Sequence, residues 1–566
     1  MTRMRLIFVF VIAWVVVAPV VPGAGLAGPG SHAIASAHPA ATAAGREVLD
    51  AGGNAFDAAV AVAAALAVVE PYSSGIGGGG FFLLHSIRDG QDIFIDAREK
   101  APAAATADMY LDEAGEFVRG RALNGPLAAG IPGLPAALVH LVEQHGQRTL
   151  AQNLAPAVRL ARDGFETGPR YGIMAGFRAN AFQASPEASG IFLVDGEAPE
   201  VGTRIVQADL AATLESIGRD GGESFYRGEL ATKLVAGVRA EGGIWTLDDL
   251  KAYDVKLRQP IVAQYHDIKV TSAPPPSSGG IVLVEALNVL ERYDLKAFDE
   301  ITRVHVVIEA MRRAYRDRAD FLGDPDFNDI PLERLLDKTY ADWLARDLDR
   351  DTATPSTSLP PIGVKPEGKD TTHFSVLDAA GNRVAATLSI NYPFGACTVP
   401  PGTGVLLNNE MDDFSAAPLT PNAYGLVGAG ANAIAPGKRP LSSMTPTFLE
   451  TPERIGIIGT PGGSRIISMV LIGALEFARG RPPQDWVSAK RYHHQYLPDE
   501  VQFEKGGFNA EQQAALTARG HSLNENRRNY GNMQAILWER NSGQVHAASD
   551  PRGEGGADVW PTAKSP

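Results

Sequence analysis

The 566-residue chain contains a single cysteine, Cys397, and so cannot form an internal disulfide bond. If the chain is exported, as its N-terminus suggests below, the lack of disulfides is more typical of the bacterial periplasm, or of secretion from a bacterium, than of a eukaryotic secretory route. Cys397 lies far from the N-terminus, which excludes it as a lipid-attachment residue. We expect it to be a small, buried hydrophobic residue.

Positive charge is also scarce. The 51 lysines and arginines are outnumbered by 65 aspartates and glutamates, and the formal net charge is −14. Because nucleic-acid binding depends on clustered basic residues, and these cluster only at the extreme N-terminus, we expect no nucleic-acid partner. Hydrophobic residues make up 45% of the chain, which is enough for a large core and more than one lobe.

Only one long apolar run occurs, at residues 6–21. It follows Arg3 and Arg5 and precedes several small residues. This layout is typical of a secretory signal peptide, which we place at residues 1–27. The alternative is an uncleaved membrane anchor, although the run is shorter than the ~20 residues that a spanning helix needs. We therefore expect export to the periplasm or medium, without stable membrane insertion after signal removal.

The spacing of apolar residues predicts both helices and strands. Residues 38–53 and 54–70 are expected to form helices, the second buried because small apolar residues surround it. Residues 135–348 have a mostly helical pattern and are interpreted as scaffold. Strand pairs, or a strand followed by a helix, are expected at 79–99, 371–391, 454–480 and 533–552. Such a mixture suggests stacked layers of sheet and helix, an α/β (α+β) fold.

The stretch TTHFSV (371–376) begins where a Pro/Ser/Thr-rich loop, residues 351–370, runs into a strand. If the bond between Asp370 and Thr371 were cut, Thr371 would carry both a hydroxyl nucleophile and an α-amine. An α-amine with a pKa near ~8 can accept the hydroxyl proton at physiological pH, so one residue would supply nucleophile and base. The plainer alternative is a threonine that simply favours a strand.

Three other polar stretches follow in the chain. NNEMDDFS (408–415) holds Asp412 and Asp413, which suit either a metal or acid/base pair or a solvated turn. LSSM (441–444) places two hydroxyls between apolar residues. TPGGSR (460–465) ends a strand, and its backbone N–H groups can point together at an oxyanion, although a tight turn also needs glycines.

TTHFSV, NNEMDDFS, KRPLSSMTPT and GTPGGSR occur in the order and at the spacing of the γ-glutamyltranspeptidase family, which the chain resembles. The segment 32–68, GIGGGGFF (75–82) and IDAREKAP (95–102) resemble the opening of that family. The resemblance covers essentially the whole chain after residue 27. It implies the four-layer αββα sandwich of the N-terminal-nucleophile hydrolases, and it implies no cofactor and no metal.

The resemblance also implies self-cleavage between Asp370 and Thr371. The products would be a large subunit, residues 28–370, and a small subunit, residues 371–566, which stay associated. Thr371 would then attack γ-glutamyl compounds such as glutathione and pass the acyl group to water, an amino acid or a peptide. The backbone N–H groups of Gly462 and Gly463 would hold the oxyanion.

Further residues receive roles from the same resemblance. The substrate's α-carboxylate would bind Arg98 and the hydroxyls of Ser442 and Ser443, and its α-ammonium would bind the acceptors Asn391, Glu410 and Asp413. For Arg98 the alternative is a surface ion pair with Glu99. At the position where many family members have a threonine hydrogen-bonded to the nucleophile, this chain has Ser389. The alternative is that Thr387, which lies on the same face of the strand, is the matching residue. The segment 418–428 resembles a lid, with Tyr424 as its gate.

Four alternatives stand beside this interpretation. His373 and the pair His493–His494 suggest a metal, but no third ligand has zinc-like spacing. The glycine run 77–80 lacks the GK[ST] of a phosphate loop and is expected to allow close backbone packing. A cephalosporin (glutaryl) acylase-type amidohydrolase would share the fold and the nucleophile. A non-enzymatic relative would be expected to lack Thr371 or the glycine pair, and both are present.

Overall fold

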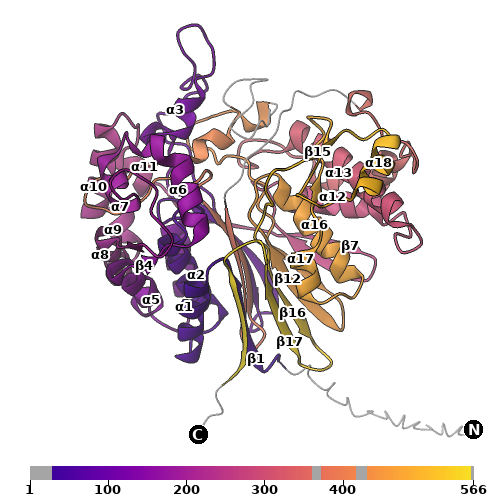
Figure 1. Ribbon diagram of the computed structural model, residues 1–566. Coiled ribbons are helices and arrows are strands. Elements are labelled where there is room, and N and C mark those ends of the chain that lie inside the picture. Colours follow the sequence, from indigo (N-terminus) through magenta and orange to yellow (C-terminus); the bar gives the residue numbers. More distant parts are fainter. Residues whose placement is uncertain (1–27, 360–370, 416–429, 563–566) are drawn as a thin grey trace, which may run out of the picture.

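The computed structural model describes residues 28–359, 371–415 and 430–562 (Figure 1). The predicted signal peptide, Asp370 and Tyr424 lie outside these residues. Within the described ranges, no helix combines the length and the apolar character that crossing a bilayer requires.

Two antiparallel sheets form the centre of the molecule (Figure 1). The strand order of the first is β18 (Gly556–Pro561), β1 (Ser31–Ser36), β9 (Thr372–Leu377), β10 (Arg383–Ser389), β2 (Gly79–Ser86), β3 (Gln91–Ala97) and β6 (Lys256–Arg258). That of the second is β17 (Val545–Ser549), β16 (Gln534–Glu539), β12 (Arg454–Gly459), β11 (Thr447–Glu450), β8 (Ile268–Ser272) and β7 (Ile261–Tyr265). Contacts of β9 and β10 with β12, and of β9 with β16, bring the sheets face to face.

Helices cover the outer side of each sheet. α1 (Pro39–Asp50) packs on β1, and α2 (Ala55–Val69) packs on β9 and β10. On the other side α12 (Gly279–Leu290) packs on β7 and β8, and α16 (Arg465–Ala478) packs on β11 and β12. Figure 1 shows these two helical groups on opposite sides of the sheets. The expected mixed α/β fold is confirmed.

The remaining elements extend these layers. Helices around the first group are α3 (Arg119–Leu123), α4 (Leu134–His145), α5 (Leu150–Asp163), α6 (Pro169–Phe182), α7 (Pro186–Phe192), α8 (Ala208–Asp220), α9 (Gly222–Tyr226), α10 (Glu229–Ala240) and α11 (Leu247–Lys251). Those around the second are α13 (Glu300–Phe321), α14 (Leu332–Leu336), α15 (Lys338–Ala345), α17 (Pro483–Ser488) and α18 (Ala510–Ala518). Short strands are β4 (Phe165–Glu166), β5 (Arg204–Ile205), β13 (Tyr492–His493), β14 (Val501–Phe503) and β15 (Leu523–Glu525).

Most predicted elements are confirmed, and the helix with small residues on all sides is the clearest case. Every residue of α2 is buried, because the helix lies between the first sheet and α4 and α5. The helical interpretation of residues 135–348 was incomplete, since β6, β7 and β8 lie inside it. These strands have three to five residues, and β6 and β7 are edge strands with exposed side chains, so their alternation is weak.

The glycine run 77–80 allows the close backbone packing that the sequence suggested. A Cβ on Gly78 would overlap the carbonyl oxygen of Ser389, and one on Gly80 would overlap that of Thr387. The run therefore lets β2 and the loop before it lie directly against β10. Cys397 is buried as expected, and burial raises the pKa of its thiol to about 11.

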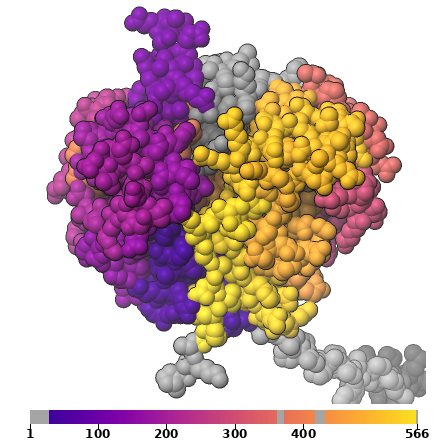
Figure 2. All heavy atoms as spheres, in the orientation of Figure 1, coloured from indigo at the N-terminus to yellow at the C-terminus, as the bar shows by residue number. Residues whose placement is uncertain are grey.

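The two parts of the chain on either side of residue 370 are interleaved. Figure 2 shows the yellow C-terminal residues between the indigo N-terminal surface and the orange surface of the later segments. In the first sheet, β9 and β10 lie between β1 and β2. Thr371, which precedes β9, is thus placed at the end of a central strand.

Candidate active site

Thr371 directly precedes β9 and is only 6% exposed. Side chains alternate along a strand, so Thr371 shares a face with His373, and this face looks toward the second sheet. A Cβ on Gly459, at the end of β12, would overlap the His373 ring. The loop that follows Gly459 therefore begins beside the face to which Thr371 belongs.

His373 is a core histidine. Its Nδ1 lies 2.8 Å from Thr387 Oγ1 and its Nε2 lies 3.3 Å from Ser375 Oγ. Burial lowers its pKa to about 3, so the ring is neutral. Because Thr387 is engaged by His373, the candidate hydroxyl next to Thr371 is that of Ser389.

The register of β10 supports the choice of Ser389. Leu388 pairs with Thr372, so the next residue on each strand places Ser389 opposite Thr371. Ser389 Oγ accepts the backbone N–H of Asn391 at 2.7 Å, and Asn391 Nδ2 donates to the carbonyl oxygen of Asn409 at 2.9 Å. Asn391 has φ of 72°, a left-handed conformation that asparagine tolerates.

Arg98 is buried, with 1% exposure, which excludes the surface ion pair. Its Nη1 lies 2.7 Å from Glu410 Oε2 and 3.6 Å from Glu99 Oε2, and its Nη2 binds Asp413. Arg98 thus contacts directly two carboxylates that the sequence assigned to the opposite end of the substrate. The predicted substrate roles of these residues stay predictions.

This carboxylate cluster is short of positive charge. One guanidinium, Arg98, faces Glu99, Glu410 and Asp413. Burial, opposed by Arg98, raises the pKa of Glu99 to about 8. Burial, opposed by Arg98, also raises the pKa of Glu410, and the neighbouring carboxyls of Glu99 and Asp413 add to the rise. Arg98 is therefore the shared counter-charge of all three carboxyls.

The two residues just before the serine pair contact the same arginine. Arg98 donates from Nε to the carbonyl oxygen of Pro440 at 3.2 Å and from Nη2 to that of Leu441 at 3.2 Å. The Ser442 hydroxyl accepts the Met444 N–H at 3.1 Å, and the Ser443 hydroxyl accepts from Arg318 Nη2 at 2.9 Å. Sequence reasoning missed Arg318, because it lies within an ordinary helical pattern of α13.

Gly462 and Gly463 join β12 to α16. Their φ angles are 143° and 59°, which favour glycine at both positions. A Cβ on Gly462 would lie 2.7 Å from Met469 Cε, so the loop packs closely on α16. The turn requirement is thus met by the same two residues for which the sequence predicts an oxyanion role, and that role stays a prediction.

Glu70 is a buried neighbour that the sequence did not single out. Thr372 Oγ1 donates to Glu70 Oε2 at 2.7 Å, and both side chains are buried. Burial, only partly offset by the Thr372 hydrogen bond, raises the pKa of Glu70 to about 7. The residue ends α2 in an apolar run, and nothing in that pattern indicates a partner more than 300 residues away.

We expect Glu70→Gln to reduce the pH dependence of stability. Between pH 4.5, the ordinary pKa of the carboxyl, and pH 7 the native state keeps a proton that the unfolded state has lost. The free energy of unfolding therefore falls as the pH rises through this window, by up to about 3 kcal/mol, and the loss is complete above it. Urea denaturation at pH 5 and pH 8 should show a smaller difference for the variant, with the exposed Glu143→Gln as control. If the free energy of unfolding differed equally between the two pH values in the wild type and both variants, the raised pKa would not belong to Glu70.

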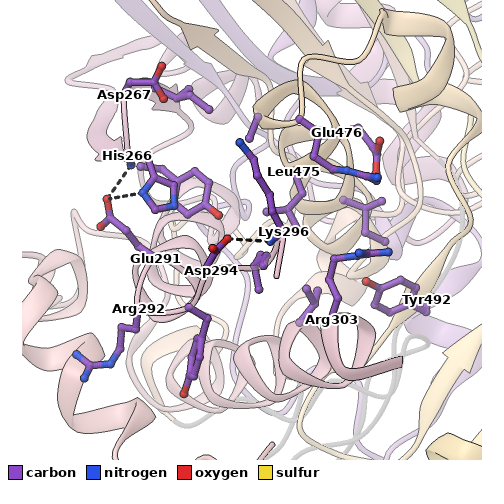
Figure 3. Close-up of a pocket in the computed structure, with 18 residues that line it drawn as sticks. His266, Asp267, Glu291, Arg292, Asp294, Lys296, Arg303, Leu475, Glu476 and Tyr492 are labelled. Atoms are coloured by element: carbon purple, nitrogen blue, oxygen red, sulfur yellow. Dashed lines mark hydrogen bonds and ion pairs between the residues drawn. The ribbon is translucent and has the colours of Figure 1, made fainter. Parts of the chain in front are cut away.

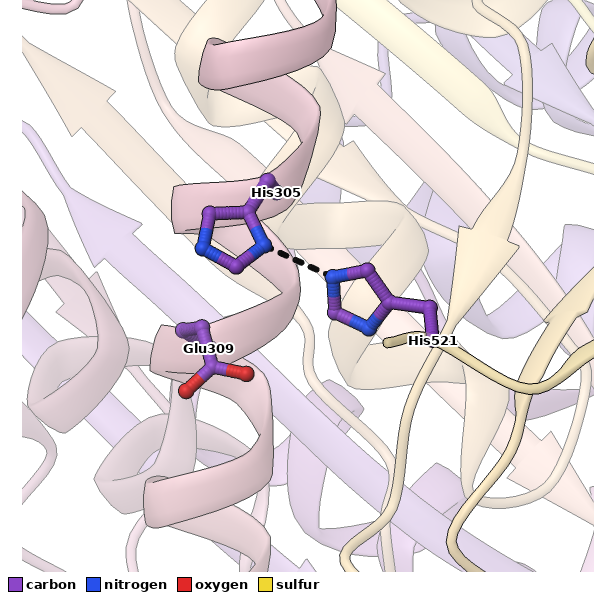
Figure 4. A group of neighbouring side chains, drawn as sticks. All are labelled: His305, Glu309 and His521. Carbon is purple, nitrogen blue, oxygen red and sulfur yellow. Dashed lines mark hydrogen bonds between the residues drawn. The ribbon is translucent and has the colours of Figure 1, made fainter. Parts of the chain in front are cut away.

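The histidines form no convincing metal centre in the described residues. His493 lies 2.7 Å from Ser468 Oγ and His494 lies 3.2 Å from Asp499 Oδ1, so the neighbouring rings have separate partners. Figure 4 shows His305, Glu309 and His521, whose ligand atoms lie within 4.8 Å of one another. However, His305 Nδ1 lies 2.7 Å from His521 Nε2, and Glu309 already binds Arg312 and Arg313, whose charges oppose a cation.

A cavity of about 580 Å³ lies away from these residues (Figure 3). It is lined by the β7–β8 turn, the segment 291–296 and the outer end of α16, and it includes Arg303 and Glu476. None of the predicted site residues lines it. Its volume alone therefore does not make it the catalytic site.

Comparisons with known proteins agree with the motifs. The family described as Gamma-glutamyltranspeptidase matches residues 41–560. The glutathione hydrolase proenzyme of Pseudomonas sp. (strain A14) is 44% identical over 87% of this chain and 86% of its own, and that of Escherichia coli (strain K12) is 41% identical over 92% and 90%. The crystal structure of cephalosporin acylase from Bacillus halodurans is 30% identical, with a TM-score of 0.82 over 94% of this chain and 96% of that one. The matched length and the identities show that the chain belongs to the γ-glutamyltranspeptidase family.

Proposed function

We propose that this protein is a self-processing γ-glutamyl hydrolase and transpeptidase with the αββα fold of the N-terminal-nucleophile hydrolases. Thr371 Oγ attacks the carbonyl carbon of Asp370, the acyl group moves from nitrogen to oxygen, and water cleaves the ester. This yields the subunits 28–370 and 371–566, after removal of residues 1–27 on export to the periplasm or medium. Thr371 then carries a free α-amine beside its hydroxyl.

The mature site uses the same hydroxyl on γ-glutamyl amides such as glutathione. The α-amine of Thr371 accepts the hydroxyl proton, and Thr371 Oγ attacks the γ-carbonyl carbon. The N–H groups of Gly462 and Gly463 stabilise the oxyanion, while Ser389 positions the nucleophile. The amine leaves with a proton, and water or an amino acid then takes the acyl group from Thr371.

The observation that supports a glutamyl group most strongly is the charge of the Arg98 cluster. A glutamyl group brings one carboxylate for Arg98, Ser442 and Ser443, and one ammonium for Asn391, Glu410 and Asp413, so the net charge does not change. A glutaryl group brings only the carboxylate to a place where one guanidinium faces three carboxyls. Burying an unpaired charge is costly, which favours the zwitterion. Tyr424 in the segment 418–428 is proposed to cover the site.

Intact mass and two chromogenic donors test this function. We expect two chains, the smaller beginning at Thr371, and a kcat/KM for γ-glutamyl-p-nitroanilide at least about tenfold above that for glutaryl-p-nitroanilide. Asp413→Asn should reduce the ratio of the two kcat/KM values, because it removes a negative charge that binds the substrate's α-ammonium in this proposal. Two chains with a preference for glutaryl would favour the acylase alternative. A single uncut chain would contradict the mechanism itself.

A further inference from the structure

The carboxyl of Glu70 contacts β9 from the side opposite the second sheet. Thr372 follows Thr371 directly, so the two side chains point to opposite faces of the first sheet. Thr371 belongs to the face toward the second sheet, and Thr372 to the face on which α2 packs. There Thr372 Oγ1 donates to Glu70 Oε2 at 2.7 Å. Both side chains are buried, so water does not compete for this hydrogen bond.

The backbone of Glu70 anchors a loop that lies against the neighbouring strand, β10. The Glu70 carbonyl oxygen accepts the N–H groups of Ser73 and Ser74 at 2.8 and 3.0 Å. The loop then continues into the glycine run, where a Cβ on Gly78 would overlap the carbonyl oxygen of Ser389. Glu70 therefore contacts β9 with its side chain and holds the loop beside β10 with its backbone.

Self-cleavage would make the contact with Thr372 more important. In the intact chain, peptide bonds hold Thr371 on both sides. In the proposed function, cleavage removes the bond to Asp370, and Thr371 stays covalently attached only to Thr372. The positions of its α-amine and its hydroxyl then depend on how firmly Thr372 is fixed.

We propose that Glu70 is a positioning residue, which holds Thr371 in the geometry for attack through its hydrogen bond to Thr372. It acts through Thr372 and not on the substrate. The hold strengthens when the carboxyl ionises, because a hydrogen bond to a carboxylate is stronger than one to a neutral carboxyl. The inference rests on the proposed function and adds to it a residue on the helical side of the first sheet.

The surroundings of Glu70 place its ionisation near neutral pH. Burial raises its pKa to about 7, and the hydrogen bond from Thr372 opposes the rise. Arg170 of α6 and Tyr72 also lower this pKa, whereas Glu554, in the loop before β18, raises it. The Arg170 guanidinium lies 5.7 Å from the ring centre of Tyr72, and its backbone N–H donates to Glu554 Oε1 at 2.9 Å. The carboxyl is therefore mostly neutral at pH 6 and mostly charged at pH 8.5.

The pH profile separates this role from a purely structural one. Glu70→Gln keeps an acceptor for Thr372 but cannot ionise. The ratio of wild-type to variant kcat for γ-glutamyl-p-nitroanilide should therefore rise about fivefold between pH 6 and pH 8.5. The α-amine of Thr371 titrates in both proteins and cancels in this ratio. A contribution of Glu70 to folding alone would give the same ratio at both pH values.

Substitutions at Thr372 test the same contact from the other side. Thr372→Val removes the donor and should lower kcat at pH 8.5 about tenfold, whereas Thr372→Ser keeps the hydroxyl and should stay within about twofold of the wild type. Thr213→Val is the control. It removes an equally short buried hydrogen bond in α8, from Thr213 Oγ1 to the carbonyl oxygen of Thr403 at 2.7 Å, and should leave kcat unchanged.

Two results would overturn the positioning role: a ratio that does not change with pH, or a wild-type kcat in Thr372→Val. A wild type that is cut but releases no p-nitroaniline would instead contradict the proposed function. Intact mass would still decide the inference, because self-cleavage uses the same hydroxyl. More uncut precursor should then remain in Thr372→Val than in Thr213→Val, and equal amounts would overturn the role. A wild type that stays one chain would overturn both.

Discussion

Thr371→Ala is expected to leave the precursor as one chain and to reduce release of p-nitroaniline from γ-glutamyl-p-nitroanilide by at least about 10³-fold. The same hydroxyl is needed to cut the bond before residue 371 and to form the acyl-enzyme, and alanine has none. Thr371 is 6% exposed at the start of β9, so removing its hydroxyl should not unfold the strand. Intact mass and the chromogenic assay measure the two losses on one sample.

Two variants control this experiment. Thr371→Ser keeps a hydroxyl and, after cleavage, an α-amine, so it should be cut and should retain part of the activity. Thr372→Val removes the adjacent hydroxyl and its hydrogen bond to Glu70, but leaves Thr371 in place, so cleavage should persist. A Thr371→Ala protein that is still cut before residue 371 would assign the nucleophile to another residue.

Arg98→Met is expected to lower the free energy of unfolding by about 3–5 kcal/mol, the usual cost of leaving a buried charge unpaired. The arginine is 1% exposed, and its loss leaves Glu410, Asp413 and Glu99 without their shared counter-charge. γ-Glutamyl transfer should be lost as well, because the substrate's α-carboxylate loses the partner proposed for it. Urea denaturation and the chromogenic assay measure the two effects.

The double variant Arg98→Met/Glu410→Gln separates charge balance from packing. Glu410→Gln removes one uncompensated carboxyl, so the double variant should be more stable than Arg98→Met alone. It should remain inactive, because neither change restores a carboxylate partner. Arg88→Met, at an exposed arginine, controls for the loss of an ordinary guanidinium. If the effects of the two substitutions on the free energy of unfolding simply added, Arg98 and Glu410 would not belong to one buried network.

The helices and strands with a clear hydrophobic periodicity could be predicted from the sequence alone. The Ala-rich helix α2, the β2–β3 hairpin and the β9–β10 pair are predicted because burial and turn chemistry leave clear periodicities. The short strands β6, β7 and β8 were missed, since strands of three to five residues carry little alternation, and β6 and β7 also lie at sheet edges. The motifs also brought Thr371 and Ser389 to one place, which the β9–β10 register supports.

Contacts between distant segments were not predictable from local patterns. Glu70 binds Thr372 across 302 positions, and Arg318 binds Ser443 across 125. The direct contact of Arg98 with Glu410 was also missed, because a motif assigns roles toward a ligand and says nothing about how charges pair without one. Such pairings depend on the packing of whole layers.

The interleaved sheets make the two proposed subunits a single folding unit. Four ladders, β18–β1, β1–β9, β10–β2 and β11–β8, join strands from opposite sides of residue 370. After cleavage the pieces can separate only by breaking all four, so dissociation and unfolding become one event. Refolding then requires an encounter of two molecules, and the melting temperature of the cut protein should rise with protein concentration, whereas that of the uncut precursor should not.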